Sequence, residues 1–236
     1  MSSQRINNIF NMRRRKQIFR CTSLAMEDNF DQFLKIAIDF RHATDHETSP
    51  VIAFTSSRPG EGTTTIACNM ALAIASNLQK NTLLVDAGSR DGGPAKFMGV
   101  SGNPSGFFDI IEGKVEAKQA IARHPDSGLY FLPAGNIPRY PIASLEKESC
   151  KNLINDLRKE FDFVIFDTMP VVVSPVTPLL ASYLDYTILV VEAEKTRWEV
   201  AKHAKNTLHE AGAHLAGAIL NKKQMFIPGF IYKYIL

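Results

Sequence analysis

A glycine-rich segment from Ser57 to Thr65 carries the residue types of a phosphate-binding loop. Gly60 and Gly62 let backbone N–H groups face an anion without a Cβ in the way. A predicted strand precedes the segment and a predicted helix follows it, so the free amides and the positive dipole end of that helix would face the same anion. The segment predicts a site for nucleotide phosphates, with an ordinary strand-to-helix turn as the alternative.

The loop departs from the Walker A pattern G-x-x-x-x-G-K-[ST] at two positions. Thr64 occupies the Ser/Thr position, whose hydroxyl ligates Mg²⁺, but Thr63 stands at the lysine position and Ser57 at the first glycine position. A charged hydrogen bond to a phosphate contributes roughly 1.5–3 kcal/mol. Loss of the lysine therefore predicts triphosphate binding weakened by about tenfold to a hundredfold. Mg²⁺ with ATP or ADP remains the expected ligand.

Two aspartates directly follow buried strands. Asp86 comes after residues 83–85, and Asp167 comes after residues 163–166. Because the carboxyl ends of parallel strands line one crevice, both carboxylates should lie beside the loop, where they would bind Mg²⁺ directly or through water. A helix N-cap is the alternative for either aspartate alone, and the pair weakens it. The predicted Mg²⁺ ligands are Thr64, Asp86 and Asp167, and the two aspartates are the catalytic candidates if the chain is active.

Short apolar runs alternate with helical patterns along the chain, which predicts a doubly wound α/β domain with a mostly parallel sheet and helices on both faces. The apolar spacing also predicts an amphipathic helix from Phe30. The predicted strands are residues 51–54, 83–85, 130–132, 163–166, 187–191 and 216–220. The predicted helices that follow the first strand are residues 64–78, 145–159, 178–184 and 199–211.

Charge divides the chain into unlike parts. The formal net charge is +3, but residues 1–20 hold six basic residues and no acid, so the rest of the chain is mildly acidic. This argues against a nucleic-acid surface over the whole body, and we expect no nucleic-acid partner. The three cysteines lie far apart, which argues against a disulfide framework. We expect a basic arm at residues 1–25, a P-loop domain at 26–225 and an apolar tail at 226–236.

Together these motifs resemble the cytoplasmic domain of bacterial tyrosine kinases (BY-kinases) of capsular and exopolysaccharide biosynthesis, within the MinD/ParA superfamily of P-loop ATPases. The similar stretches are the Walker A segment at 55–62, the A′ segment at 83–87, the Walker B segment at 161–170, and residues 132–135 and 217–221. The resemblance implies nucleotide contacts from Asn221, at the adenine, and from the loop residues Arg58, Gly60, Glu61, Gly62, Thr63, Thr64 and Thr65.

The sequence departs from the family where its chemistry would occur. Thr63 replaces the lysine, Gly88 replaces the second acid of the A′ segment, and Met169 replaces a proline after the Walker B aspartate. The family's C-terminal tyrosine cluster is reduced to Tyr232 and Tyr234, which are phospho-acceptor candidates or packing residues. The resemblance therefore implies a nucleotide-binding protein of polysaccharide assembly whose kinase activity is weak or lost.

Several further expectations concern partners. The resemblance implies an inner-membrane polysaccharide co-polymerase (chain-length protein) as partner, and a cytoplasmic protein peripheral to the inner membrane. Residues 1–20 mix basic and apolar side chains, which suits an anionic membrane surface, with a disordered soluble arm as the alternative. Arg58 is either a solvated loop residue or a cation that reaches a neighbouring subunit's phosphates in a homo-oligomer. The alternative functions are an active protein-tyrosine autokinase and a MinD/ParA-like ATPase acting as a spatial regulator.

Overall fold

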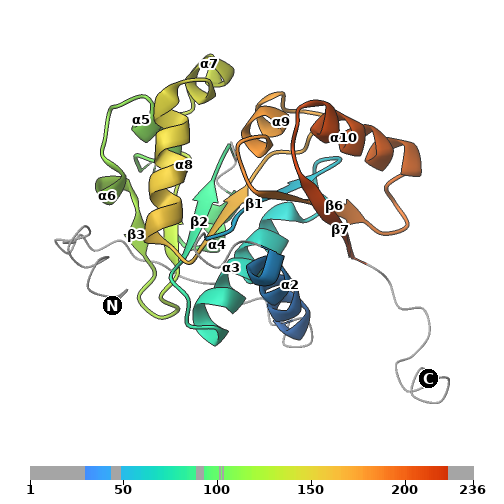
Figure 1. Ribbon diagram of the computed structural model, residues 1–236, viewed down its shortest axis with the longest axis horizontal. Coiled ribbons are helices and arrows are strands. Elements are labelled where there is room, and N and C mark those ends of the chain that lie inside the picture. Colours follow the sequence, from blue (N-terminus) through green and yellow to red (C-terminus); the bar gives the residue numbers. More distant parts are fainter. Residues whose placement is uncertain (1–29, 44–48, 89–92, 101, 103, 223–236) are drawn as a thin grey trace.

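A computed structural model describes residues 30–43, 49–88, 93–100, 102 and 104–222 (Figure 1). The basic arm and the apolar tail predicted at the two ends of the chain, with Tyr232 and Tyr234, lie outside the described residues. No helix in the described part is both long and apolar enough to cross a bilayer. The described residues all fall within the range predicted for the P-loop domain.

A seven-stranded sheet forms the centre of the described structure, in the order β3-β4-β2-β5-β1-β6-β7. Its strands are β1 (Val51–Ser56), β2 (Thr82–Asp86), β3 (Ala122–Arg123), β4 (Tyr130–Leu132), β5 (Phe163–Asp167), β6 (Tyr186–Glu192) and β7 (Leu215–Asn221). All neighbouring pairs are parallel except β3 and β4. The central strands are buried along their length, as the uninterrupted apolar runs predict.

Helices cover both faces of this sheet (Figure 1). Alternate side chains of β1 point to opposite faces, so Val51 and Ala53 belong to one core while Ile52 and Phe54 belong to the other. The second core is closed by α2 (Phe30–Ala43), α3 (Thr63–Asn77) and α4 (Gly93–Phe97). The first is closed by α5 (Phe107–Ile111), α6 (Ala117–Ala120), α7 (Pro141–Leu145), α8 (Glu148–Glu160) and α9 (Val176–Ala181). The last helix, α10 (Trp198–Glu210), packs with β6 in a smaller cluster.

The predicted fold class is confirmed, with differences in the short elements. The helix predicted at 145–159 is α8, which begins later, at Glu148, because its N-cap Lys147 has an extended backbone (φ −64°, ψ 145°). Leu145 instead ends the separate short helix α7. The helix predicted at 178–184 is α9, which begins and ends earlier. The two-residue strand β3 and helices α4 to α7 are additional elements. None of these differences moves the carboxyl edge of the central strands, where the predicted site lies.

Candidate functional site

The phosphate-loop candidate connects β1 to the N-terminus of α3. Gly60 and Gly62 have φ angles of 84° and 92°, which favour glycine, and Gly62 is the N-cap of α3 without a side-chain cap. The backbone amides from Glu61 to Thr64 donate no hydrogen bond within the described part of the chain. No acidic residue occupies the first turn of α3. The loop therefore presents a row of uncommitted donors at a positive helix end, as an anion site requires.

The two predicted aspartates lie side by side at the carboxyl edge of the sheet. Asp86 ends β2 and Asp167 ends β5, and the two are register partners in the parallel pair. Both are buried, with 2% and 3% of their surface exposed. Thr64 donates a hydrogen bond from its hydroxyl to Asp167 Oδ2 at 2.7 Å, which joins the loop to the Walker B strand. The structure thus brings together the three residues predicted from separate segments.

The electrostatics of this pair are unfavourable without a cation. Burial raises the pKa of the Asp167 carboxyl to about 8, the Thr64 hydrogen bond opposes the rise, and the charge of Asp86 adds to it. Asp167 Oδ1 is buried and has no hydrogen-bond partner within the described residues. A buried carboxylate oxygen left unpaired costs free energy unless a proton or a cation joins it.

These residues fit a Mg²⁺ ion. The described residues contain no cluster of three or more His, Cys, Asp or Glu side chains that could hold a metal. Mg²⁺ does not need such a cluster, because it keeps several waters and binds through one or two carboxylates together with substrate phosphates. Asp167, Asp86 and the Thr64 hydroxyl would hold the ion, and it would supply positive charge to neutralise phosphate oxygens.

Two hydroxyl residues occupy the positions where the Walker A pattern differs. Thr63 is the first residue of α3 and is 8% exposed, so its short side chain is enclosed at the loop. Ser57, at the first glycine position, is fully buried, and its hydroxyl has no partner within the described structure. No cationic side chain therefore replaces the lysine from within the loop itself, since Arg58 is exposed and no contact of its guanidinium is found in the described part.

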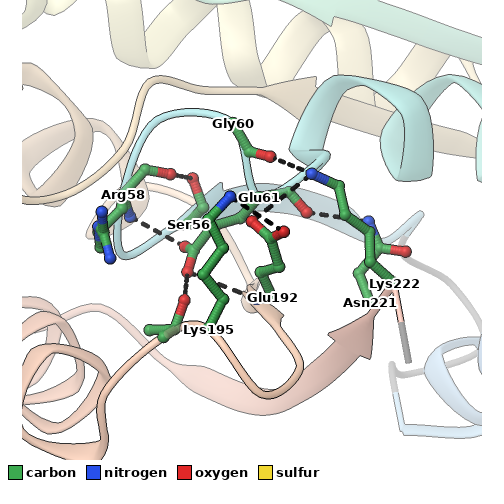
Figure 2. Close-up of polar contacts among 9 residues, drawn as sticks. Ser56, Arg58, Gly60, Glu61, Glu192, Lys195, Asn221 and Lys222 are labelled. Carbon is green, nitrogen blue, oxygen red and sulfur yellow. Dashed lines mark hydrogen bonds and ion pairs between the residues drawn. The ribbon is translucent and has the colours of Figure 1, made fainter. Parts of the chain in front are cut away.

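The outer side of the loop is fixed by a buried carboxylate (Figure 2). Glu61 is 2% exposed and accepts hydrogen bonds from the Arg58 amide (2.9 Å), the Thr196 hydroxyl and the Glu192 amide (3.4 Å). Ser56 adds a hydrogen bond from its hydroxyl to the Arg58 carbonyl at 3.0 Å. Glu61 thus connects the loop to the segment that follows β6.

The end of β7 holds the same side of the loop (Figure 2). Asn221 Nδ2 donates to the Glu61 carbonyl at 2.9 Å, and Lys222 Nζ donates to the Gly60 carbonyl at 2.6 Å. Lys222 also pairs with Glu192 at 3.5 Å. The adenine contact predicted for Asn221 stays a prediction, but the structure already places its side chain against the loop.

Sequence reasoning overlooked Glu192, Thr196 and Lys222. A signal was present for the first of these, because Glu192 directly follows the predicted strand 187–191, as Asp86 and Asp167 follow theirs. The same edge rule applied to this strand would have placed Glu192 beside the loop. Thr196 and Lys222 lie in irregular segments, where no periodic pattern indicates a contact.

A hollow of about 550 Å³ opens next to the aspartates. Gly88 and Met169, which lie two residues after Asp86 and Asp167, line it, so two of the departures from the family pattern are at this space. Its other walls are mainly apolar and include Phe108, Tyr140 and Val176. Its position suits an apolar or aromatic group that approaches the carboxyl edge of the sheet.

Comparisons with known proteins agree with this geometry. Residues 49–216 match the family model described as an AAA domain. The tyrosine-protein kinase YwqD of Bacillus subtilis is 30% identical over 197 residues, which cover 84% of this chain and 82% of the relative. The solved VpsO kinase domain is 30% identical with a TM-score of 0.71, covering 85% of this chain and all of that domain.

A more distant structure shares only the fold. The septum site-determining protein MinD of Pyrococcus horikoshii, solved with Mg-ADP, is 18% identical with a TM-score of 0.56. The match covers 80% of this chain and 77% of that protein. This chain and that protein therefore share the fold of the sheet and its helices.

Proposed function

The chain belongs to the family of bacterial tyrosine kinases (BY-kinases), and we propose that it is a nucleotide-binding member whose phosphotransfer activity is weak or lost. Its ligand is Mg-ADP or Mg-ATP, held by loop residues 57–65 with Asp86 and Asp167 at the metal. Its role is to regulate a membrane co-polymerase of exopolysaccharide or capsule assembly. It acts in the cytoplasm at the inner membrane.

One observation carries the proposal: the loop has uncommitted amides and lies beside the predicted Mg²⁺ ligands, although buried Thr63 stands at the lysine position. The amides from Glu61 to Thr64 are uncommitted, and Thr64 contacts Asp167 at 2.7 Å. Phosphoryl transfer depends mainly on positioned positive charge, which the lysine would supply to the transition state as well as to the bound nucleotide. Its loss should therefore lower the rate more than the affinity.

Calorimetric titration with Mg-ADP and Mg-ATP tests the proposal. We expect weak binding by the wild type and a gain of about tenfold to a hundredfold in Thr63→Lys, from one charged hydrogen bond. Ser76→Lys is the matched control, because it adds the same charge to an exposed position near the far end of α3. Equal affinities of Thr63→Lys and Ser76→Lys would show that the loop does not have nucleotide-binding geometry. If neither the wild type nor Thr63→Lys binds, the nucleotide proposal fails.

An active tyrosine autokinase is the second candidate, favoured by the relatives that bear that name. It would use the exposed Arg58 across a homo-oligomer and phosphorylate Tyr232 or Tyr234. Incubation with Mg-ATP followed by mass spectrometry decides this, since phosphate on either tyrosine supports the kinase and its absence rejects the acceptor role. Arg58→Ala should reduce the yield only if the arginine acts in trans.

Membrane attachment through residues 1–20 completes the proposal. Six basic residues near apolar side chains would be attracted to anionic lipid. Co-sedimentation with phosphatidylserine-containing vesicles should fall when residues 1–20 are removed and when salt is raised. Equal pelleting of both proteins would reject the arm as the membrane anchor.

A further inference from the structure

We propose that Asn221 and Lys222, hereafter the β7 clamp, are positioning residues that orient the anion-binding amides of the phosphate loop. This inference rests on the proposed nucleotide site and deepens it. The clamp reaches the loop from the end of the outermost strand, 160 residues along the chain from Glu61 (Figure 2). It touches the carbonyl side of the loop, opposite to the side that an anion would occupy.

The argument follows from the geometry of the peptide bond. A trans peptide is planar, and its C=O and N–H point in opposite directions. The described residues contain no cis peptide bond. Lys222 holds the Gly60 carbonyl at 2.6 Å, which directs the Glu61 N–H to the other side, and Asn221 holds the Glu61 carbonyl at 2.9 Å, which directs the Gly62 N–H likewise.

The amides of Glu61 and Gly62 are thus directed away from the β7 clamp before any ligand binds. Neither amide donates a hydrogen bond to the described protein. A preorganised donor costs less to engage than a mobile one, because the loop does not have to lose conformational freedom on binding. In a loop that has threonine in place of lysine, these amides carry a larger share of the phosphate contact.

The backbone of Lys222 supports a specific role. Its φ angle is 56°, in the left-handed region that residues with a Cβ occupy at a cost. The side chain makes two contacts from this conformation, to the Gly60 carbonyl and to Glu192. A conformation of this kind persists where surrounding contacts stabilise it, and such residues concentrate at functional sites.

Lys195 provides a matched control. It pairs with the same carboxylate, Glu192, at 3.2 Å, and it is exposed as Lys222 is, but no contact between Lys195 and the loop is found in the described structure. Lys195→Met and Lys222→Met therefore remove the same charge from the same acidic partner. Only the second removes a hydrogen bond to the phosphate loop.

The first measurement needs no ligand. Heteronuclear ¹⁵N NOE values of Glu61 and Gly62 report backbone motion on the picosecond-to-nanosecond timescale. We expect values similar to those of α3 in the wild type and in Lys195→Met, clearly lower values in Lys222→Met, and values near wild type in Lys222→Arg, which keeps a donor. Unchanged values in Lys222→Met would overturn the clamp. This measurement tests the clamp even if the protein binds no nucleotide, so a negative result is distinct from failure of the proposed function.

The second measurement links the clamp to binding. We expect Lys222→Met to bind Mg-ADP about three- to tenfold more weakly than wild type and Lys195→Met to bind within about twofold. Asn221→Leu, titrated with inorganic pyrophosphate, separates the clamp from an adenine contact, because pyrophosphate has no base. Weaker pyrophosphate binding by Asn221→Leu supports the clamp. Loss of ADP affinity with unchanged pyrophosphate affinity, or equal ADP affinity in Lys222→Met and wild type, would reject it.

Discussion

Replacing Asp167 by asparagine should remove a pH dependence from the stability of the metal-free protein. In the folded chain, burial raises the pKa of this carboxyl to about 8, whereas the pKa of an unfolded aspartate is about 3.9. Between these values the folded state holds a proton that the unfolded state has lost. Stability therefore falls as pH rises through this window, and the loss is complete above the folded-state pKa.

The raised pKa of Asp167 sets the size of this change in the free energy of unfolding. Each pH unit inside the window costs up to about 1.4 kcal/mol, so between pH 5 and pH 7 the wild type should lose about 2.5 kcal/mol through this group. The asparagine side chain of the Asp167→Asn variant would carry no charge at any pH, and its amide oxygen can still accept the hydrogen bond from Thr64. The variant should therefore lack this part of the slope.

Urea unfolding followed by circular dichroism in EDTA, at half-unit steps from pH 5 to pH 8.5, measures the slope directly. Asp156→Asn is the control, because Asp156 is an exposed helix residue whose carboxylate pairs only with Lys159 among the described contacts. Mg²⁺ added at pH 8 should restore stability to the wild type and not to Asp167→Asn. Parallel pH curves for the wild type and Asp167→Asn would refute the reasoning.

Other predictions test the loop, the base of the sheet and the core. Gly62→Ala should destabilise the protein by more than about 1 kcal/mol in thermal or urea unfolding, because alanine is strained at a φ angle of 92° and its Cβ would overlap the Asn221 side-chain amide. Gly113→Ala, at a φ angle of 75° but with open space around the new Cβ, should destabilise the protein less. Arg158→Met should lower the unfolding free energy by about 1 kcal/mol through loss of the 2.5 Å bridge to Asp185. Its Mg-ADP affinity should stay at the wild-type value, and a change would place the bridge in the site. Phe166→Ala should cost about 3–5 kcal/mol because the ring is fully buried, and a cost below about 1 kcal/mol would contradict its place in the core.

The parallel sheet was predictable from sequence because its central strands are buried on both faces. Residues 51–54 and 163–166 are continuous apolar runs, and these runs indicate such strands without any knowledge of their neighbours. The short elements were not predictable in this way. Helix α6 has four residues and β3 has two, too few for a period to emerge, and the division between α7 and α8 depends on the backbone of Lys147. The order of the strands follows from tertiary packing.

The candidate site likewise contains residues that were predictable from sequence and residues that were not. Thr64, Asp86 and Asp167 were predictable because each stands at a fixed position relative to a strand, and strand ends meet at one edge. The support around the loop was not, because the Lys222 side chain, far along the chain from the loop, contacts the Gly60 carbonyl and Glu192. No local pattern specifies a contact across 162 residues.

The position of Lys222 has one more consequence, which concerns coupling between the phosphate loop and the C-terminal residues. It is the last described residue, it touches the Gly60 carbonyl, and the polypeptide continues from it into residues 223–236. A partner that bound residues 223–236 would bind next in sequence to Lys222, which contacts the phosphate loop. If binding of this partner changes the nucleotide affinity by some factor, bound nucleotide changes the affinity of the protein for the partner by the same factor, because linkage between two binding sites is reciprocal. Affinity of a tail-binding partner, measured with and without Mg-ADP, would therefore report the state of the loop from outside it.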